Sequence, residues 1–304
     1  MSNGLARITN WYCRLTEEGG QTFSEVVIES TSPFPYRIER PGPGTLVLVA
    51  EALANAHPDT IIVDDGLVDE VSLTIPRTGE VEAQVKLEAD VVWEHRTQNS
   101  LPFKTILRFE RSILTKIFSH KTIVIDPGHG GADFGYRGPV SLREKQVTLK
   151  MATVLNEILR SFGAETFLTR QQDVSLSWQE RLNLARQKKA EVFISLHTHW
   201  APDAKINGAA VFYNPIMPQS EGLAREILAR ITRKGKVTGR GIAPSWSLTE
   251  LGRIAGLIIE PATISNWVEE GLFRSPDFHR KIAYGIAVGL EKYFAQQEGA
   301  SYAS

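Results

Sequence analysis

The pattern of apolar and polar residues changes near residue 116 of this 304-residue chain, and this change restricts the fold more than any other feature. Before it, apolar and polar residues alternate, most strictly over 81–89, which is typical of a β-strand with one face in water. Further strand candidates lie at 24–30, 45–49, 60–63, 69–75, 91–95 and 105–110. Because glycine-containing turn signals separate these segments, residues 1–115 are predicted to form a small all-β, sandwich-like domain.

After residue 116, strand patterns alternate with amphipathic helix patterns. Strands are expected at 121–126, 165–169, 191–196, 209–213 and 255–260. Helices are expected at about 147–162, 178–189, 219–233 and 276–294. Such alternation predicts an α/β domain with a mostly parallel sheet flanked by helices. We assign it to residues 122–297, after a linker at 116–121 and before a C-terminal tail at 298–304.

Composition and charge exclude several classes of protein. The chain is 42% hydrophobic and 23% charged, as ordinary globular proteins are. Residues 1–116 hold 11 basic and 17 acidic side chains, and the remainder holds 23 and 18. This mild basic excess would suit a polyanion such as a cell wall, but without an aromatic–basic stripe it does not indicate a nucleic-acid binder. No apolar run approaches the ~18 residues of a transmembrane segment.

Polar residues follow three of the expected strands, at the point where each strand ends. His129, His197 and Glu260 occupy these positions. Ligands of open α/β sheets bind at the carboxyl ends of the strands, so we expect the three side chains at one rim. Glu260 also ends an apolar run, where a buried carboxylate is costly unless it has a partner.

Two histidines and a carboxylate with one open position form the pattern of a catalytic zinc site. Glu144, 15 residues after His129 at the expected start of a helix, could supply the carboxylate. His199 lies two residues after His197 and points to the same side of the strand. Each residue also has an ordinary structural interpretation, because a loop histidine can bond to backbone and a first-turn glutamate favours a helix N-terminus.

Taken together and in order, these segments closely resemble the zinc-dependent N-acetylmuramoyl-L-alanine amidases of the type 3 family, over about residues 120–296. The segments are Ile125-Asp126-Pro127-Gly128-His129-Gly130-Gly131, Leu142-Arg143-Glu144-Lys145, Leu168-Thr169-Arg170, Glu180-Arg181, Ser195-Leu196-His197, and Ile259-Glu260 followed by Ile264-Ser265-Asn266.

The resemblance implies a role for each matching residue. It implies that His129, Glu144 and His197 bind Zn²⁺, that Glu260 is the catalytic carboxylate, and that peptidoglycan is the substrate. Arg170 and Arg181 match recurrent family positions, and we expect structural roles for them. The segments Thr198-His199 and Pro261-Ala262-Thr263 depart from the usual family pattern, which leaves the pocket floor and the substrate preference open. Residues 1–115 are similar, more weakly, to the AMIN modules that bind envelope polymers.

Two other functions stay open. The chain could be a different zinc hydrolase of the cell wall, a peptidase or a deacetylase, in which His199 replaces Glu144 as the third ligand. It could also be an envelope-binding protein whose hydrolase domain is silent. Residues 1–4 lack the features of a signal peptide. We therefore expect an envelope or extracellular location if a signal peptide has been removed, and the location is otherwise undetermined.

Overall fold

The computed structural model describes residues 5–42, 44–89 and 91–297. The expected tail at 298–304 and the residues examined for a signal peptide, 1–4, lie outside these ranges. The described chain divides into two compact units, the first ending at Leu114 and the second beginning at Thr115. Helix α1 (Ser112–Phe118) includes that point, so the segment expected as a linker begins with the end of this helix.

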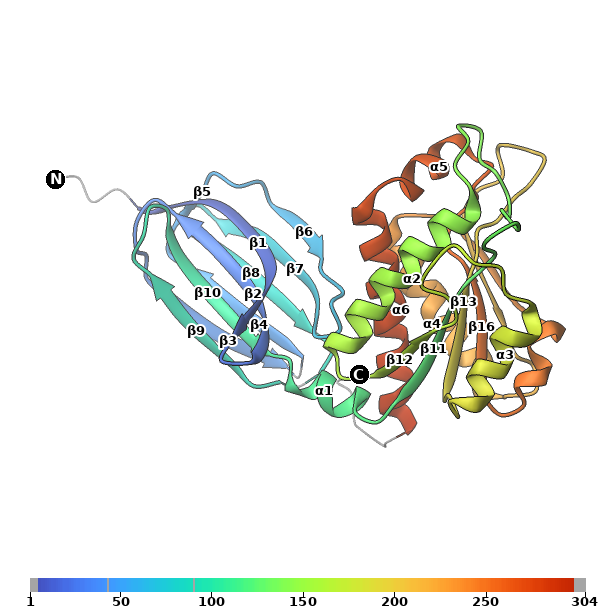
Figure 1. The fold of residues 1–304 in the computed structure, drawn as a ribbon. Coiled ribbons are helices and arrows are strands. Elements are labelled where there is room, and N and C mark those ends of the chain that lie inside the picture. The colour runs from blue at the N-terminus through green and yellow to red at the C-terminus, as the bar shows by residue number, and fades with distance from the viewer. Residues whose placement is uncertain (1–4, 43, 90, 298–304) are drawn as a thin grey trace. The chain divides into compact units, whose positions relative to one another are not determined.

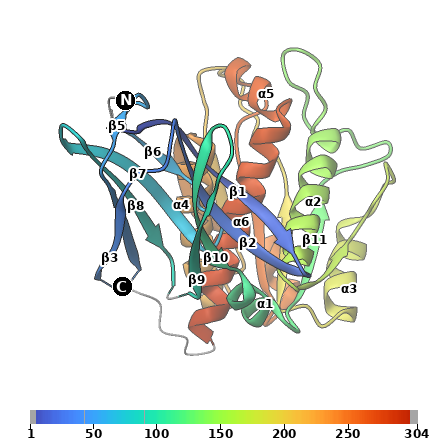
Figure 2. The ribbon, with the colours of Figure 1, turned by 90° about the vertical axis from the view of Figure 1, so that its left-hand side faces the viewer.

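The first unit consists of two five-stranded sheets, which confirms the predicted all-β region (Figure 2). One sheet has the order β5-β1-β2-β10-β9, with strands Leu53–Ala54, Arg7–Glu18, Gln21–Ser30, Phe103–Glu110 and Trp93–Gln98. The other has the order β3-β4-β8-β7-β6, with strands Tyr36–Gly42, Thr45–Ala50, Glu80–Leu87, Val68–Arg77 and Asp59–Ile62. Pairing is antiparallel except between β1 and β5.

A hydrophobic core lies between the two sheets of this unit. Strand β8 shows why, because its alternate residues Val81, Ala83 and Val85 are buried while the residues between them are partly exposed. They pack in one cluster with residues of the opposite sheet such as Ile28 and Leu107. The alternation of apolar residues therefore fixes which face of each strand points inward.

The second unit is built on a six-stranded sheet with the order β12-β11-β13-β16-β14-β15. In that order the strands are Glu165–Leu168, Thr122–Pro127, Val192–Leu196, Ala255–Glu260, Ala209–Tyr213 and Gly239–Pro244. The first four run parallel to one another and β14 pairs parallel with β15, so four of the five pairings are parallel, as expected of a mostly parallel sheet. The sheet is nevertheless mixed, because β14 is antiparallel to β16, and this reversal was not expected. The physical reason is that residues 197–208 join β13 to β14 without a helix, whereas parallel strands need a crossover.

Helices cover both faces of this sheet (Figure 1). On one face lie α2 (Glu144–Ser161), α4 (Gln219–Gly235) and α6 (Pro276–Gln297). On the other face lie α3 (Trp178–Gln187) and the 3₁₀ helix η1 (Trp246–Leu251), while α5 (Trp267–Phe273) precedes α6. Helix α3 begins with the capping box of Ser177 and Glu180 that the sequence indicates. Among the described residues, no helix combines the length and the apolar character required to cross a membrane.

Candidate metal centre

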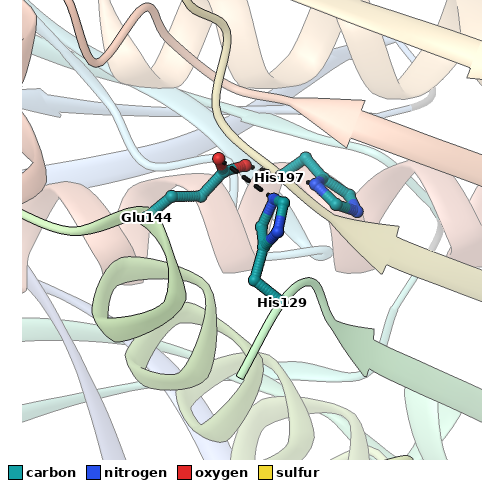
Figure 3. Close-up of side chains that lie close together, drawn as sticks. All are labelled: His129, Glu144 and His197. Atoms are coloured by element: carbon teal, nitrogen blue, oxygen red, sulfur yellow. Dashed lines mark hydrogen bonds and ion pairs between the residues drawn. The ribbon is translucent and has the colours of Figure 1, made fainter. Parts of the chain in front are cut away.

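Three side chains from separate segments meet at the carboxyl edge of the sheet (Figure 3). His129 follows β11, Glu144 is the first residue of α2, and His197 follows β13. One donor atom from each lies within 4.8 Å of the others. His129 Nε2 is 3.1 Å from Glu144 Oε2, and His197 Nδ1 is 3.2 Å from Glu144 Oε1. The structure thus brings together the three residues that the family resemblance implies as ligands.

The donor set fits a small divalent metal ion. Around a tetrahedral zinc with bonds of about 2.1 Å, ligand atoms lie roughly 3.4 Å apart, and here one donor atom from each of the three residues lies within 4.8 Å of the others. Two glycines leave the necessary space. A Cβ at Gly128 would lie 2.4 Å from Cε1 of His197, and one at Gly135 would lie 2.6 Å from Oε2 of Glu144. Side chains at these positions would displace the donor groups.

Further hydrogen bonds orient two of the three donors, His129 and Glu144. His129 Nδ1 lies 2.8 Å from Asp133 Oδ2, which leaves Nε2 directed at the other donors. The backbone N–H of Thr198 donates to Glu144 Oε1 at 2.7 Å, and that of Tyr136 donates to Oε2 at 2.8 Å. Such outer contacts fix the tautomer and the direction of metal ligands. The carboxylate of Glu144 is therefore held at both oxygens.

The charges in this cluster are strongly coupled. Burial by itself would raise the pKa of Glu144, but hydrogen bonds to the imidazoles of His129 and His197 hold that pKa far below its ordinary value. Burial would lower the pKa of His129, but the carboxylates of Glu144 and Asp133 raise it. A metal ion would bind the neutral imidazole of His129 and the ionised carboxylate of Glu144, so metal binding would be coupled to the release of protons from these groups.

Two buried arginines hold the backbone that carries His129. Arg170 donates from Nε to the carbonyl oxygen of Pro127 at 2.9 Å. Arg181 donates to Asp126 Oδ1 at 2.6 Å and to the carbonyl oxygen of His129 at 2.9 Å. His129 itself has a positive φ of 61°. These contacts stabilise the turn after β11, and neither guanidinium belongs to the donor cluster.

Glu260 ends β16 next to the strand that leads to His197. The register pairs Leu196 with Ile259, so the next residues on the two strands, His197 and Glu260, are neighbours. The Glu260 side chain is largely buried and lies outside the cluster of three donors. Its Oε2 accepts a hydrogen bond from Nη2 of Arg240 and lies 3.3 Å from Nδ1 of His199. The carboxylate is thus held in place by two cationic or hydrogen-bonding groups.

Arg240 is a residue that the sequence analysis did not identify. The register of β14 and β15 shifts between Ala209 and Ala210, which pair with Gly239 and Gly241, so Arg240 is the extra residue of a β-bulge. Bulges redirect side chains near functional sites. From this position Arg240 donates through Nε to the carbonyl oxygen of Gly208 at 3.1 Å and reaches Glu260 two strands away. The sequence signal that could have identified Arg240 is its position directly before a glycine in a short segment with few apolar residues.

His199 lies beside Glu260 and outside the cluster of metal donors. Its backbone N–H donates to the carbonyl oxygen of Ala262 at 3.0 Å, so it forms a bridge to the segment after β16. Burial and the nearby charge of Arg240 lower the pKa of His199. The structure therefore places this histidine next to the expected catalytic carboxylate and does not include it in the group of three donors.

The fold and the site define a class of protein. The second unit is an α/β domain with a mixed sheet, and its His–Glu–His cluster could hold a metal ion at the carboxyl ends of the strands. The chain belongs to the N-acetylmuramoyl-L-alanine amidase family, because the model of that family matches residues 123–292, more than half of its length.

Individual relatives agree with this assignment. The germination-specific N-acetylmuramoyl-L-alanine amidase of Bacillus subtilis is 32% identical over 200 residues, covering 59% of this chain and 82% of that protein. YrvJ of Bacillus subtilis is 34% identical over 178 residues, covering 58% of this chain but only 34% of its own length. The chain thus spans about a third of that relative. Among solved structures, the amidase AmiC2 of Nostoc punctiforme has a TM-score of 0.53 at 27% identity, covering 57% of this chain and 96% of that one.

Proposed function

We propose that this protein hydrolyses the amide bond between N-acetylmuramic acid and L-alanine in peptidoglycan, with Zn²⁺ as its cofactor. The observation that carries the proposal is the convergence of His129, Glu144 and His197 next to Glu260 in a chain of the amidase family. The first three residues would hold the metal ion. Glu260 is not a member of this donor group and would transfer the proton.

The chain's own groups have separate tasks in this mechanism. Bound zinc would polarise the amide carbonyl and lower the pKa of water toward neutrality. Glu260 would accept a proton from the attacking water and deliver one to the leaving amine nitrogen of L-alanine. Arg240 and His199 would fix the direction of the Glu260 carboxylate, since both contact its Oε2. Asp133 would keep His129 oriented through Nδ1.

We further propose that residues 1–115 form an AMIN-like module that binds an envelope polymer, and that the protein acts at the cell envelope. The two five-stranded sheets of the first unit are consistent with a binding module. The His–Glu–His cluster lies in the second unit, and the role that we propose for the first unit is attachment.

The proposal is tested with the substitution Glu260→Gln. The variant should retain the zinc content of the wild type, because Glu260 is not a member of the donor cluster. Its rate of release of L-alanine amino groups from purified peptidoglycan should fall by about 10²–10⁴-fold. Glu144→Gln should instead lose zinc. Undiminished turnover by zinc-loaded Glu260→Gln would contradict the catalytic role. Release of acetate in place of amino groups would favour a deacetylase.

A further inference from the structure

Two aromatic rings are stacked on each other at the surface of the second unit. The rings of Tyr136 and Trp200 have centroids 5.6 Å apart and planes inclined by only 12°. Tyr136 is 49% exposed and Trp200 is 40% exposed, so each ring keeps a substantial part of its surface in water. Large apolar surfaces in water are unfavourable, and a contiguous exposed pair often marks a binding site.

Both rings belong to the segments that carry the candidate metal ligands. The backbone N–H of Tyr136 donates to Glu144 Oε2 at 2.8 Å, which ties this residue directly to a donor group. Trp200 follows His197 by three residues. The neighbouring Ala201 N–H donates to Ser265 Oγ at 3.0 Å, and the Ile264 N–H donates to the carbonyl oxygen of His199 at 2.7 Å. The stacked pair is therefore anchored beside the metal centre by its backbone.

The proposed reaction requires a sugar ring close to the metal centre. In the muramoyl–alanine linkage, three single bonds of about 1.5 Å separate the scissile carbonyl carbon from the pyranose ring, which places the ring roughly 4 Å away. A pyranose presents a face of C–H groups, and such faces pack against aromatic rings while the hydroxyl groups stay at the rim. The stem peptide begins with L-alanine and offers no comparable flat face.

We propose that Tyr136 and Trp200 form a platform that binds a pyranose ring of the glycan strand next to the scissile bond. This inference rests on the proposed amidase function for the position of the sugar, but the binding itself does not need catalysis. The platform makes the enzyme prefer stem peptides that are still attached to glycan.

The binding test uses the zinc-loaded full-length protein and a tetramer of N-acetylglucosamine, which contains no peptide. The chain has six tryptophans, so an ¹H–¹⁵N spectrum resolves six indole N–H signals, and the signal missing from Trp200→Ala identifies Trp200. The Trp200 signal should move with the tetramer concentration in a saturable way. Trp246 is the matched control. It is 74% exposed and precedes β16, at the end of that strand opposite to Glu260, and its signal should not move.

The kinetic test compares a muramoyl-peptide with the same lactyl-peptide lacking the sugar. In Trp200→Ala and Tyr136→Ala, the ratio of kcat/KM for the sugar-bearing substrate to that for the sugar-free one should fall about tenfold. In Trp246→Ala it should stay at the wild-type value. Zinc content and the melting temperature of each variant show that the fold is intact.

The outcomes distinguish failure of the proposed sugar-binding platform from failure of the proposed amidase function. A stationary Trp200 signal at high tetramer concentration, or an unchanged kcat/KM ratio in both platform variants, would overturn the platform. A wild-type protein that holds zinc and cleaves neither substrate would defeat the proposed function. In that case a saturable shift of the Trp200 signal, with Trp246 unmoved, would still establish the glycan site.

Discussion

At the scale of single residues, Glu144 organises the site, because it contacts both imidazoles and accepts two backbone hydrogen bonds. The sequence predicted His129, His197 and Glu260 at one rim from strand ends alone. The periodicity of the sequence could not identify Glu144 as a metal ligand, since a glutamate in the first turn of a helix is common. Its role in the cluster depends on the loop 128–143, whose path is set by tertiary hydrogen bonds and not by a local pattern.

The contact between His129 and Asp133 gives a prediction at this scale. Asp133→Asn removes the carboxylate that holds the Nδ1 side of His129. Loss of such a contact typically weakens metal binding 10–100-fold, and we expect that reduction in zinc affinity. A competition titration against a zinc-chelating dye measures it. Asp277→Asn is the control, because Asp277 is exposed at the start of α6 and pairs only with Lys281 among the contacts found for it. Equal affinity in wild type and Asp133→Asn would refute the assigned orientation of His129.

At the scale of elements, the sequence predicted most helices and strands of the second unit but not the direction of β14. The strand itself was expected at 209–213, which is where it lies. Its reversal follows from the helix-free connection at 197–208, whose length alone does not determine direction. Strand β15 was missed because Gly239, Gly241 and Pro244 are residue types that are typical of turns and not of strands. Strands β1 and β3 were missed because they are rich in polar, exposed residues.

The bulge in β15 leads to a prediction about catalysis. Arg240→Met removes the hydrogen bond to Glu260 while leaving the three metal donors untouched. We expect kcat to fall by up to about 100-fold with unchanged zinc content, because a misdirected catalytic group loses its alignment with the substrate. Arg253→Met, at an exposed arginine just before β16, serves as the control. If kcat on muropeptides is the same for Arg240→Met as for that control, Arg240 does not position Glu260.

The packing of α5 against α6 predicts a dependence of stability on pH. His279 is buried and its Nε2 lies 2.7 Å from the carbonyl oxygen of Phe273. Burial, together with the charge of Lys150, lowers its pKa although the hydrogen bond opposes this. The folded state therefore disfavours the protonated imidazole, which the unfolded state accepts below about pH 6.5. The stability that neutral His279 contributes is complete above that pH and declines as the pH falls through 6.5.

Urea unfolding at pH 7.5 and pH 5.5 checks this prediction. Over that interval the wild type should lose more stability than His279→Gln, by at most about 1.4 kcal/mol per pH unit below 6.5. The variant keeps a hydrogen-bond donor for the Phe273 carbonyl but has no group that titrates in this range. An equal loss in both proteins would show that His279 does not couple folding to protonation.

At the scale of the whole molecule, the division into a β unit and an α/β unit was visible in the sequence as a change of hydrophobic period. Alternation with a period of two cannot bury one face of a helix, and the pattern after residue 116 cannot form a half-exposed strand. The two-sheet arrangement of the first unit also followed from regular turns. The ligand of this unit could not be predicted from the sequence, because sheet surfaces of this kind share no chemical motif. We therefore assign the ligand only by proposal.

The central claim is that the molecule cleaves one particular amide bond. Zinc-loaded protein is incubated with purified muropeptides in H₂¹⁸O, next to a chelator-treated sample, and the products are examined by mass spectrometry. The account predicts one ¹⁸O atom in the lactyl carboxylate of the released muramoyl sugar, a free amino group on L-alanine, and neither product after chelation. An ¹⁸O atom in acetate or in a peptide carboxylate, or no cleavage by protein that holds zinc, would contradict it.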